Sequence, residues 1–292
     1  MAYRVTFWGT RGSIPTPGPG TTRYGGNTPC VALEGVGPPE GRLVILDAGT
    51  GIRPLGKQLM EKQGRKAVQV DLLVSHTHWD HIQGLPFFAP FFGKNNSVRI
   101  WGPKQGDVDL ELILRQQMHP VVFPVPLDQL AATLAVEHVN SSTFEIDGFA
   151  VRAARLRHPG NTLAYRLTPK GGGPSMAYVT DNELGSGGDY GEPPTWRADF
   201  ERFLRGVDLL IHDAMFTPDE LEQHRGWGHS SYREAVSLAA AAGVRKLALF
   251  HHRPEREDDA MDEFMEQAAD AAAKLKAPLE VVAATEGLQL TL

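Results

Sequence analysis

The sequence predicts a mixed α/β sandwich. Short segments with strand character outnumber segments with helical character, and the two kinds are interleaved in both halves of the chain. The chain has 292 residues, of which 41% are hydrophobic and 22% are charged, a balance typical of a globular protein that buries a sizeable core. At about 150 residues per domain, this length suits one large domain or two small ones.

The predicted strands are short runs rich in β-branched and aromatic residues, bounded by residues that favour turns. Gly- and Pro-rich segments such as Pro15–Gly20 and Gly171–Pro174 separate some of them and indicate surface loops. In chain order, the predicted strands are Tyr3–Trp8, Cys30–Leu33, Leu43–Asp47, Gln69–Ser75, Ser97–Trp101, Phe149–Leu156, Thr162–Thr168, Ser175–Thr180, Val207–His212, Val244–Phe250, Leu279–Ala283 and Leu288–Leu292.

Three helices are predicted in the C-terminal part of the chain. The first begins at Thr217–Glu220, where a capping threonine precedes a proline and a glutamate closes the capping box. Ser231–Glu234 repeats the capping box and opens a helix that we expect to end at Gly243, because glycine adopts a left-handed conformation at little cost. The third helix covers about Asp258–Lys276 and is ended by Pro278.

Composition and charge exclude several classes of protein. The 29 Lys and Arg against 35 Asp and Glu give a net charge of −6, so binding of a polyanion requires a local basic patch. The single cysteine, Cys30, excludes an internal disulfide framework. The longest apolar run, Leu85–Phe92, is broken by prolines and too short to span a bilayer, and the N-terminus does not read as a secretion signal. We therefore expect a soluble, cytoplasmic protein without a membrane partner.

A cluster of metal-binding residue types follows the predicted strand Gln69–Ser75. His76, His78, Asp80 and His81 form the pattern H-x-H-x-D-H, which arises rarely by chance. The turn at a strand end leaves alternate side chains free to converge, so His76 and His78 can reach one cation while Asp80 and His81 point to a neighbouring position. Imidazole nitrogen and carboxylate oxygen are the ligands of a borderline metal such as zinc, which predicts a metal site here.

This motif alone leaves two metals short of ligands, so further His and Asp residues are expected at strand ends. His158 follows the strand Phe149–Leu156, Asp181 follows Ser175–Thr180, and His251 follows Val244–Phe250. Taken singly, each is more often a solvated residue or a cap of a turn. Their shared placement at strand ends, together with the first motif, favours metal binding.

With these residues the chain resembles the metallo-β-lactamase superfamily, whose signature is H-x-H-x-D-H followed by a later His, Asp and His. The resemblance runs from Phe7–Thr10 to the C-terminus. It implies a single domain over residues 1–292, folded as a four-layer αββα sandwich with two metals at one edge of its two sheets.

The resemblance also implies a role for each residue of the site. Asp47, in a segment that matches the D-x-G turn of the superfamily, supports the metal loop without binding metal. The last ligand is ambiguous because His251 and His252 are adjacent, and His251 is preferred as the first residue after its strand. The implied ligands are His76, His78 and His158 for one metal, Asp80, His81 and His251 for the other, and Asp181 as a bridge.

The implied cofactors are two divalent ions. Zn²⁺ is expected, and Mn²⁺ and Fe²⁺ tolerate the same ligands. Two dications, two ligating carboxylates and a bridging hydroxide sum to about +1, which favours an anionic substrate such as a phosphate ester. Metal coordination lowers the pKa of water to about 7, so a hydroxide nucleophile exists at neutral pH.

The C-terminal third resembles one branch of the superfamily, ribonuclease Z and its phosphodiesterase relatives. Leu209–Phe216 is similar to their H-E-A-T-F segment, with Asp213 in place of Glu, and Gly228–Ser231 is similar to their G-H-S-T segment. The histidine of that second segment is a proton shuttle in ribonuclease Z, so the resemblance makes His229 the general acid, with Asp213 as a supporting residue beside the site. Asp80 is the second catalytic residue, which orients the hydroxide or takes its proton.

One departure from ribonuclease Z concerns the substrate. Ribonuclease Z carries a long arm that clamps tRNA, inserted between the ligand His and the bridging Asp, whereas residues 159–180 of this chain offer only two strands and a turn. Small-molecule phosphodiesterases of the branch also lack the arm. We therefore expect a small phosphodiester as partner and no extended nucleic acid. A homodimer is what the branch suggests.

Three further features have an open interpretation. Pro86–Phe92 and Met118–Pro126 either wall the pocket or pack as ordinary core and surface. A basic strip near His158 is able to help hold a phosphate, but such a run is more often a solvated face, so it stays outside the predicted site. Its members are Arg152, Arg155, Arg157 and Arg166.

The predicted function is hydrolysis of a small, cyclic phosphodiester such as a cyclic nucleotide by a dinuclear metal-dependent phosphodiesterase, with the bridging hydroxide as nucleophile. One alternative is a ribonuclease Z-like endoribonuclease acting on tRNA 3′ ends. Another is a lactonase, thioesterase or β-lactamase on the same fold, against which the His229 segment argues. A metal-binding sensor without turnover is disfavoured by the complete set of candidate ligands.

Overall fold

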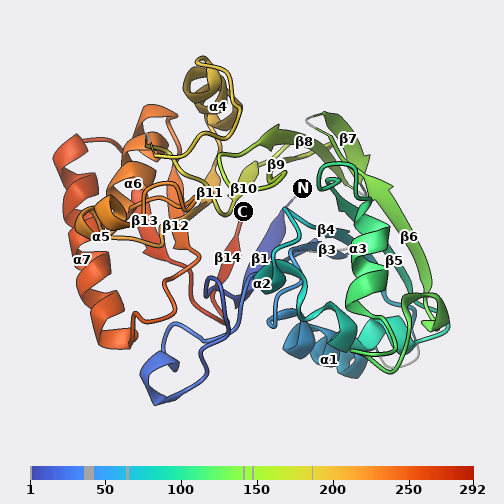
Figure 1. Ribbon diagram of the computed structural model, residues 1–292. Helices are drawn as coiled ribbons and strands as arrows, with labels where there is room; N and C mark the ends of the chain where they lie inside the picture. Colours follow the sequence, from blue (N-terminus) through green and yellow to red (C-terminus); the bar gives the residue numbers. More distant parts are fainter. Residues whose placement is uncertain (1, 36–42, 64–65, 141, 147, 186) are drawn as a thin grey trace.

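Two β-sheets face each other at the centre of the computed structural model, which describes residues 2–35, 43–63, 66–140, 142–146, 148–185 and 187–292 (Figure 1). Within these residues each sheet has seven strands. The order in the first sheet is β14 (Gln289–Thr291), β1 (Tyr3–Gly9), β2 (Cys30–Gly35), β3 (Leu43–Leu46), β4 (Gln69–Leu73), β5 (Ser97–Gly102) and β6 (Thr133–His138). The order in the second is β13 (Glu280–Ala283), β12 (Lys246–Phe250), β11 (Leu209–Asp213), β10 (Met176–Val179), β9 (Leu163–Pro169), β8 (Phe149–Arg155) and β7 (Thr143–Ile146).

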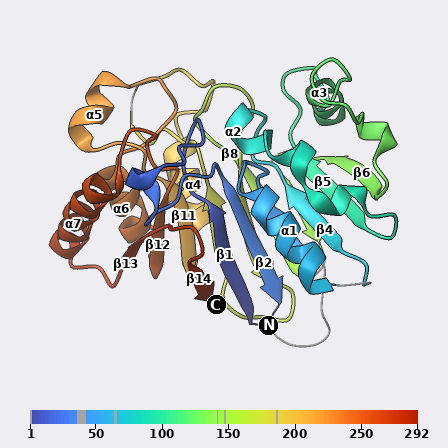
Figure 2. The same cartoon turned by 90° about the horizontal axis from the view of Figure 1, so that it is seen from below.

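Helices cover the outer face of each sheet, and the two helical layers lie on opposite sides of the molecule (Figures 1 and 2). On the side of the first sheet are α1 (Ile52–Gln63), α2 (Trp79–Ile82) and α3 (Leu110–Gln117). On the side of the second are α4 (Trp196–Leu204), α5 (Pro218–Gln223), α6 (Tyr232–Ala241) and α7 (Asp258–Leu275). Short 3₁₀ turns lie at Pro19–Thr21, Leu85–Phe87, Ala89–Phe92 and Leu127–Gln129.

The core is divided into layers that match this arrangement. Between the sheets, Phe250 of β12 packs against Phe7 of β1 and Tyr178 of β10, with ring centroids 6.2 and 5.7 Å apart. A second cluster lies between the first sheet and its helices, and a third between the second sheet and α4, α6 and α7. The central strands are buried on both faces, which explains their nearly continuous apolar sequences. The predicted four-layer αββα sandwich is confirmed.

The sequence analysis did not predict several elements, and their positions explain why. β6 and β7 are edge strands and only partly buried, so they have no strongly apolar run. The helical pattern of α1 is interrupted by Pro54 and Gly56, both poor helix formers. Gly56 is required by packing, because a Cβ there would lie 2.8 Å from the ring of Phe88. α3 and α4 are short, with eight and nine residues.

The predicted helix boundaries are confirmed at both capping boxes. The Thr217 hydroxyl accepts a hydrogen bond from the Glu220 backbone N–H at the start of α5, and Ser231 does the same with Glu234 at the start of α6. α6 ends just before Gly243, whose φ of 66° is left-handed. α7 ends at Leu275, three residues before Pro278, which would interrupt it.

The strand pairing determines where the functional residues meet. β3 to β6 run parallel to one another, and so do β10 to β13, so their carboxyl ends lie at one edge of each sheet. Asp47 follows β3, Asp181 follows β10, and Asp213 ends β11. Among the described residues, no helix has the length and apolar character needed to cross a membrane.

Candidate metal centre

The structure brings the predicted metal ligands together in two adjoining groups. Within each group the candidate ligand atoms lie no more than 4.8 Å from one another, and Asp181 belongs to both. Each group combines residues from both sheets, although their members are far apart in the sequence. The first group is His76, His78, His158 and Asp181, and the second is Asp80, His81, Asp181 and His251.

The carboxylate of Asp181 lies between the two groups. Its Oδ1 atom is 3.2 Å from Nε2 of His81 and 3.2 Å from Nε2 of His251. Its Oδ2 atom is 3.5 Å from Nε2 of His158 and 3.7 Å from Nε2 of His76. One oxygen therefore faces each group, the placement that a bridging carboxylate needs.

The Asp80 carboxylate belongs to the second group alone. Its Oδ2 atom is 3.1 Å from Nε2 of His81 and 3.1 Å from Nε2 of His251. The backbone N–H of Ser13, in the loop after β1, donates a hydrogen bond of 2.9 Å to the same oxygen. This contact ties the N-terminal loop to the centre.

The first group is open to solvent at His78. The His78 side chain is exposed, while His76 and His158 are buried. Nδ1 of His78 lies 3.1 Å from Nε2 of His158. A ligand entering from solvent therefore meets the His78 and His158 pair first.

The donor atoms fit divalent cations. The Nε2 atom of His76 is buried and has no hydrogen-bond partner, which is costly for a buried polar atom unless a ligand satisfies it. Burial lowers the pKa of His76 well below its usual value and lowers that of His158 to about 4. Neutral imidazoles keep a nitrogen lone pair free for a metal.

The carboxylates of the centre are ionised. Burial alone would raise the pKa of Asp80, but the charge of His81 and hydrogen bonds from His251 and His81 hold it well below its usual value. Burial likewise opposes ionisation of Asp181, and the surrounding histidines again lower its pKa. Two anionic and several imidazole donors in a buried volume suit a metal of intermediate softness.

Asp47 supports the centre as the D-x-G match implied. Its carboxylate accepts hydrogen bonds from the backbone N–H and hydroxyl of Ser75 at 2.7 and 2.8 Å and from the Tyr178 hydroxyl at 2.8 Å. It also lies 2.7 Å from Nδ1 of His81. With Nδ1 held on this side, Nε2 of His81 points into the centre.

The ambiguity between His251 and His252 is resolved by their directions. Nε2 of His251 points at Asp80 and Asp181, whereas Nε2 of His252 donates a hydrogen bond of 2.7 Å to the carbonyl oxygen of Ala284, away from the centre. His251 lies among the candidate ligands and His252 does not.

His229 lies beside the metal groups and is paired with Asp213. Its Nδ1 is 2.9 Å from Oδ2 of Asp213, and its ring stacks on that of His251 with centroids 5.1 Å apart. Burial alone would lower the pKa of His229, but the charge and hydrogen bond of Asp213 raise it to about 9. His229 is therefore protonated at neutral pH and sits next to the centre.

The basic strip does not point at the centre. Arg155 pairs with Glu192 at 2.8 Å, and Arg166 donates a hydrogen bond to the carbonyl oxygen of Phe203. Arg152 also lies over the ring of Phe203. These three arginines therefore bind the end of α4 and the loop before it.

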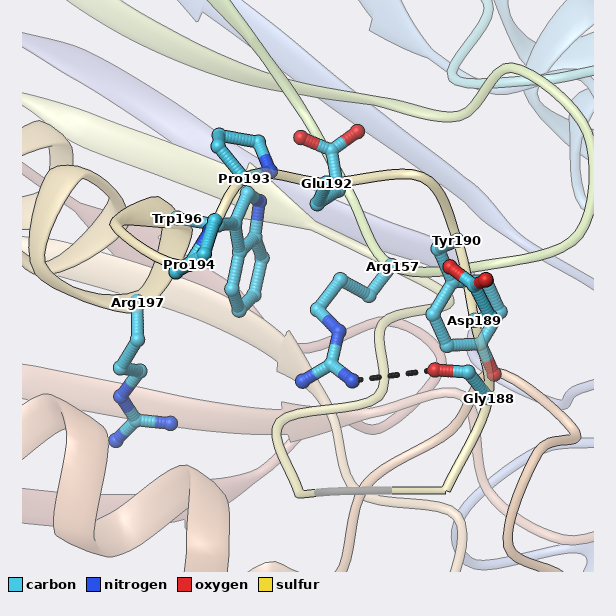
Figure 3. Close-up of a pocket in the computed structure, with 9 residues that line it drawn as sticks. All are labelled: Arg157, Gly188, Asp189, Tyr190, Glu192, Pro193, Pro194, Trp196 and Arg197. Carbon is cyan, nitrogen blue, oxygen red and sulfur yellow. Dashed lines mark hydrogen bonds between the residues drawn. The ribbon is translucent and has the colours of Figure 1, made fainter.

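Arg157, the fourth member of the strip, lines a cavity of about 430 Å³ together with residues of the loop before α4 and of the start of α4 (Figure 3). Its guanidinium group stands between the rings of Tyr190 and Trp196, 5.5 Å from each centroid, and donates hydrogen bonds to the carbonyl oxygens of Gly185 and Gly188. These contacts hold the loop before α4 against the strand that leads to His158.

Of the two segments considered as pocket walls, Pro86–Phe92 is mainly core. Phe88 and Phe91 are buried against α1 and the first sheet. Phe87 is exposed and meets Phe123 of the segment Met118–Pro126 edge-on, with centroids 5.5 Å apart. The two segments therefore touch each other, and packing explains most of their apolar residues.

Sequence analysis missed Glu183, a fully buried residue near the centre. Its Oε2 atom accepts hydrogen bonds from the Tyr190 hydroxyl at 2.5 Å and from the backbone N–H groups of Gly226 and Gly228 at 2.9 and 3.1 Å. The carbonyl oxygen of Gly228 lies 2.9 Å from Nδ1 of His158. Glu183 thus orients His158, a candidate ligand, through the backbone of Gly228. No sequence pattern predicts such a role.

An αββα sandwich with paired His/Asp groups at the edge of its sheets defines a hydrolase of the metallo-β-lactamase type. Residues 42–252 match the sequence model of the family described as "Beta-lactamase superfamily domain", and the chain belongs to this family.

Individual relatives agree with this assignment. The chain is 27% identical over 290 residues to a ribonuclease Z of Synechococcus sp. (strain CC9311), covering 86% of this chain and 87% of the relative. Among solved structures, the metallo-β-lactamase fold protein YhfI from Bacillus subtilis matches with a TM-score of 0.67 and 21% identity, covering 100% and 99% of the two chains. A diphosphatase from the PhnP family matches with a TM-score of 0.64 and 18% identity, covering 100% and 98%. The two structures share the fold.

Proposed function

We propose that this hydrolase is a phosphodiesterase that cleaves a small, cyclic phosphodiester such as a cyclic nucleotide with the help of two divalent metal ions. The observation that carries the proposal is the buried His229–Asp213 pair beside two metal-binding groups. A phosphate ester needs positive charge around its oxygens and a proton for its departing alkoxide, and this arrangement offers both.

The residues of the chain divide these tasks. His76, His78, His158, Asp80, His81, His251 and Asp181 would hold the metals. When bound, the ions supply Lewis-acid stabilisation of the phosphate charge and a more acidic water. Zn²⁺ is the proposed ion, since the donor set combines imidazoles with two carboxylates.

Asp80 orients the attacking water, and His229 donates a proton to the leaving group. The ionised Asp80 carboxylate is fixed by the Ser13 N–H and accepts a hydrogen bond from the attacking water, which orients the water toward phosphorus. The protonated His229 gives its Nε2 proton to the departing oxygen, because its Nδ1 is held by Asp213.

A small substrate is supported by the connection between β9 and β10. These antiparallel strands are joined by residues 170–175 alone, so nothing projects here that could grip a nucleic acid at a distance from the centre. Among the proteins of the same fold, one is a diphosphatase, which also acts on a phosphate compound.

The second candidate is endonucleolytic processing of tRNA 3′ ends. It is favoured by the relatives named ribonuclease Z, which match over most of their length. This function would require a surface other than an arm between β9 and β10 to bind the tRNA body.

A turnover screen tests the proposal. Purified, metal-analysed protein is assayed with a 3′,5′-cyclic nucleotide, a lactone and a β-lactam, with Asp181→Asn protein as the control for activity from contaminants. We expect the largest kcat/KM for the cyclic phosphodiester and none above background for the control. Turnover of the lactone or the lactam without turnover of any phosphodiester would contradict the proposal.

A further inference from the structure

Two tryptophans stand exposed beside the candidate metal centre. Trp79 is 81% exposed and Trp227 is 60% exposed. Trp79 lies between His78 and Asp80 in the sequence, and Trp227 directly precedes Gly228 and His229. Exposing an indole to water is unfavourable, so two of them next to one site point to a ligand that covers them.

Contacts between the flanking residues bring together the two backbone segments that carry these tryptophans. His78, the neighbour of Trp79, lies 3.1 Å from His158. His158 in turn lies 2.9 Å from the carbonyl oxygen of Gly228, the neighbour of Trp227. Each tryptophan is thus the sequence neighbour of a residue in this chain of contacts, Trp79 of His78 and Trp227 of Gly228.

The loop that carries Trp227 is held firmly from inside. Gly226 and Gly228 both have a φ of 86°, a conformation that favours glycine, and both donate their N–H to the buried Glu183. The ring of His224 packs against the indole at 88°, with centroids 4.8 Å apart. The fold therefore fixes the backbone on either side of Trp227 and leaves the indole facing solvent.

Trp79 also has neighbours that belong to the centre. It is the first residue of α2, between His78 and the buried Asp80, so both of its neighbours belong to the centre. A third exposed apolar side chain, Ile14, follows Ser13, whose N–H binds Asp80. Three separate segments that contribute contacts to the centre thus each carry an exposed apolar side chain next to the contributing residue in the sequence.

We propose that Trp79 and Trp227 form an aromatic subsite that stacks the planar group of the substrate, a nucleobase, while the phosphate lies at the metal centre. The phosphate half of this inference rests on the proposed function. Rigid indoles bind a planar ring at low entropic cost, and every nucleobase has a π face that stacks without requiring specific hydrogen bonds. The subsite therefore selects nucleotides over base-free phosphodiesters and tolerates different bases.

A binding experiment with matched ligands tests the subsite. Metal-loaded protein is titrated with adenosine 5′-monophosphate and with ribose 5-phosphate, which carries the phosphate but no base, while tryptophan fluorescence is followed. We expect the adenine nucleotide to quench the fluorescence and to bind more tightly. Trp79→Ala and Trp227→Ala should each weaken its binding by about 5- to 100-fold and leave ribose 5-phosphate binding unchanged.

Control variants separate stacking from misfolding. Trp79→Phe and Trp227→Phe keep an aromatic face and should retain nucleotide binding within about threefold, and Leu275→Ala, which shortens an exposed apolar side chain at the end of α7, should change nothing. Equal weakening of both ligands, or unchanged nucleotide binding in both alanine variants, would overturn the subsite.

Catalysis distinguishes failure of the subsite from failure of the proposed function. If the protein hydrolyses cyclic adenosine monophosphate and a base-free cyclic ribose phosphate with the same preference in wild type and both alanine variants, the subsite is wrong and the function stands. If the nucleotide binds and quenches as expected but no phosphodiester is cleaved, the subsite stands and the function is wrong.

Discussion

Two residues of the centre have left-handed backbone, which side chains other than glycine rarely adopt. Asp47 has a φ of 60° and His251 a φ of 59°. Such conformations persist only where the surroundings fix them, and they are concentrated at functional sites. At His251 the loop after β1 comes so close that a Cβ on Gly12 would lie 2.5 Å from the imidazole. The direction of the His251 side chain thus depends on its own backbone conformation and on Gly12, which leaves room for the imidazole.

Replacing His229 tests its role as proton donor. His229→Ala should keep the metals and lose about 10²–10⁴ in turnover on a substrate with a poor leaving group, because no other group then protonates the departing oxygen. The loss should be smaller on a nitrophenyl ester, whose leaving group needs little protonation. Equal losses on the two substrates would instead assign His229 a structural role.

Replacing Asp213 tests whether protonated His229 is the proton donor, because Asp213 raises the pKa of His229. A reaction that needs protonated His229 is fast below the pKa of His229 and slows as the pH rises through it, which in the wild type lies at about 9. Asp213→Asn removes the charge that raises this pKa, so the alkaline limb of the kcat/KM profile should move to lower pH by about 1–3 units. An unmoved alkaline limb would show that another group sets it.

At the level of single residues, the sequence predicted those whose type and spacing carry the chemistry. The H-x-H-x-D-H pattern, the strand-end placement of His158, Asp181 and His251, and the resemblance to known segments were sufficient for the candidate ligands. The roles of Ser13 and Glu183 could not be predicted. Ser13 acts through its backbone N–H, which does not depend on its side chain, and Glu183 belongs to no motif with a characteristic spacing. Their roles depend on which loops the fold brings together.

At the level of elements, the centre depends on strands whose carboxyl ends lie at the same edge of each sheet and on a helix that starts close to the residues of the site. Ser231, the N-cap of α6, lies two residues after His229, so the cap of this helix also fixes the loop that carries the proposed acid. Ser231 further forms an isolated bridge with Phe216, after β11. The capping box was predictable because it is a local pattern of four residues, whereas edge strands such as β6 were not, because their exposure weakens the apolar signal.

Removing the cap of α6 should destabilise the protein without removing any candidate ligand. Ser231→Ala should lower the free energy of unfolding by about 1 kcal/mol, in the range of about 0.5–2, because the N–H of Glu234 loses its acceptor. Ser237→Ala is the matched control, since Ser237 lies on the same helix and is exposed, and it should stay within about 0.5 kcal/mol. Equal effects of the two substitutions in denaturant titrations would rule out a capping contribution.

At the level of the whole molecule, the two sheets contribute different ligands to each metal group. The segment after β4 of the first sheet, which includes α2, carries His76, His78, Asp80 and His81, and strands of the second sheet are followed by Asp181 and His251. A metal ion bound in either group would therefore link the two sheets. That ligands from both sheets meet at one centre was predictable only from the resemblance to the metallo-β-lactamase superfamily. The spacing of residues in the sequence does not indicate how one sheet packs on the other.

Metal content tests this arrangement. Protein purified without chelator should contain about two divalent ions per chain, and a chelator should lower the melting temperature, because ions bound only by the folded state stabilise it. His78→Ala touches one group and should retain about one ion, whereas Asp181→Asn touches both and should lose more. One ion or none in the wild type, with no gain on reconstitution, would contradict the dinuclear centre.

The overall charge and shape of the molecule bear on the size of the substrate. A protein that grips tRNA away from the cleavage point does so through many phosphate contacts, each of which makes binding more sensitive to salt. This chain has a net charge of −6, a short connection between β9 and β10, and a basic strip whose arginines are engaged with α4 and its preceding loop. It should therefore cleave a cyclic nucleotide with a higher kcat/KM than a tRNA precursor at near-physiological salt, and raising the salt should change that kcat/KM little. If the tRNA precursor is cleaved orders of magnitude better, with a steep loss as salt rises, the ribonuclease function replaces the one proposed.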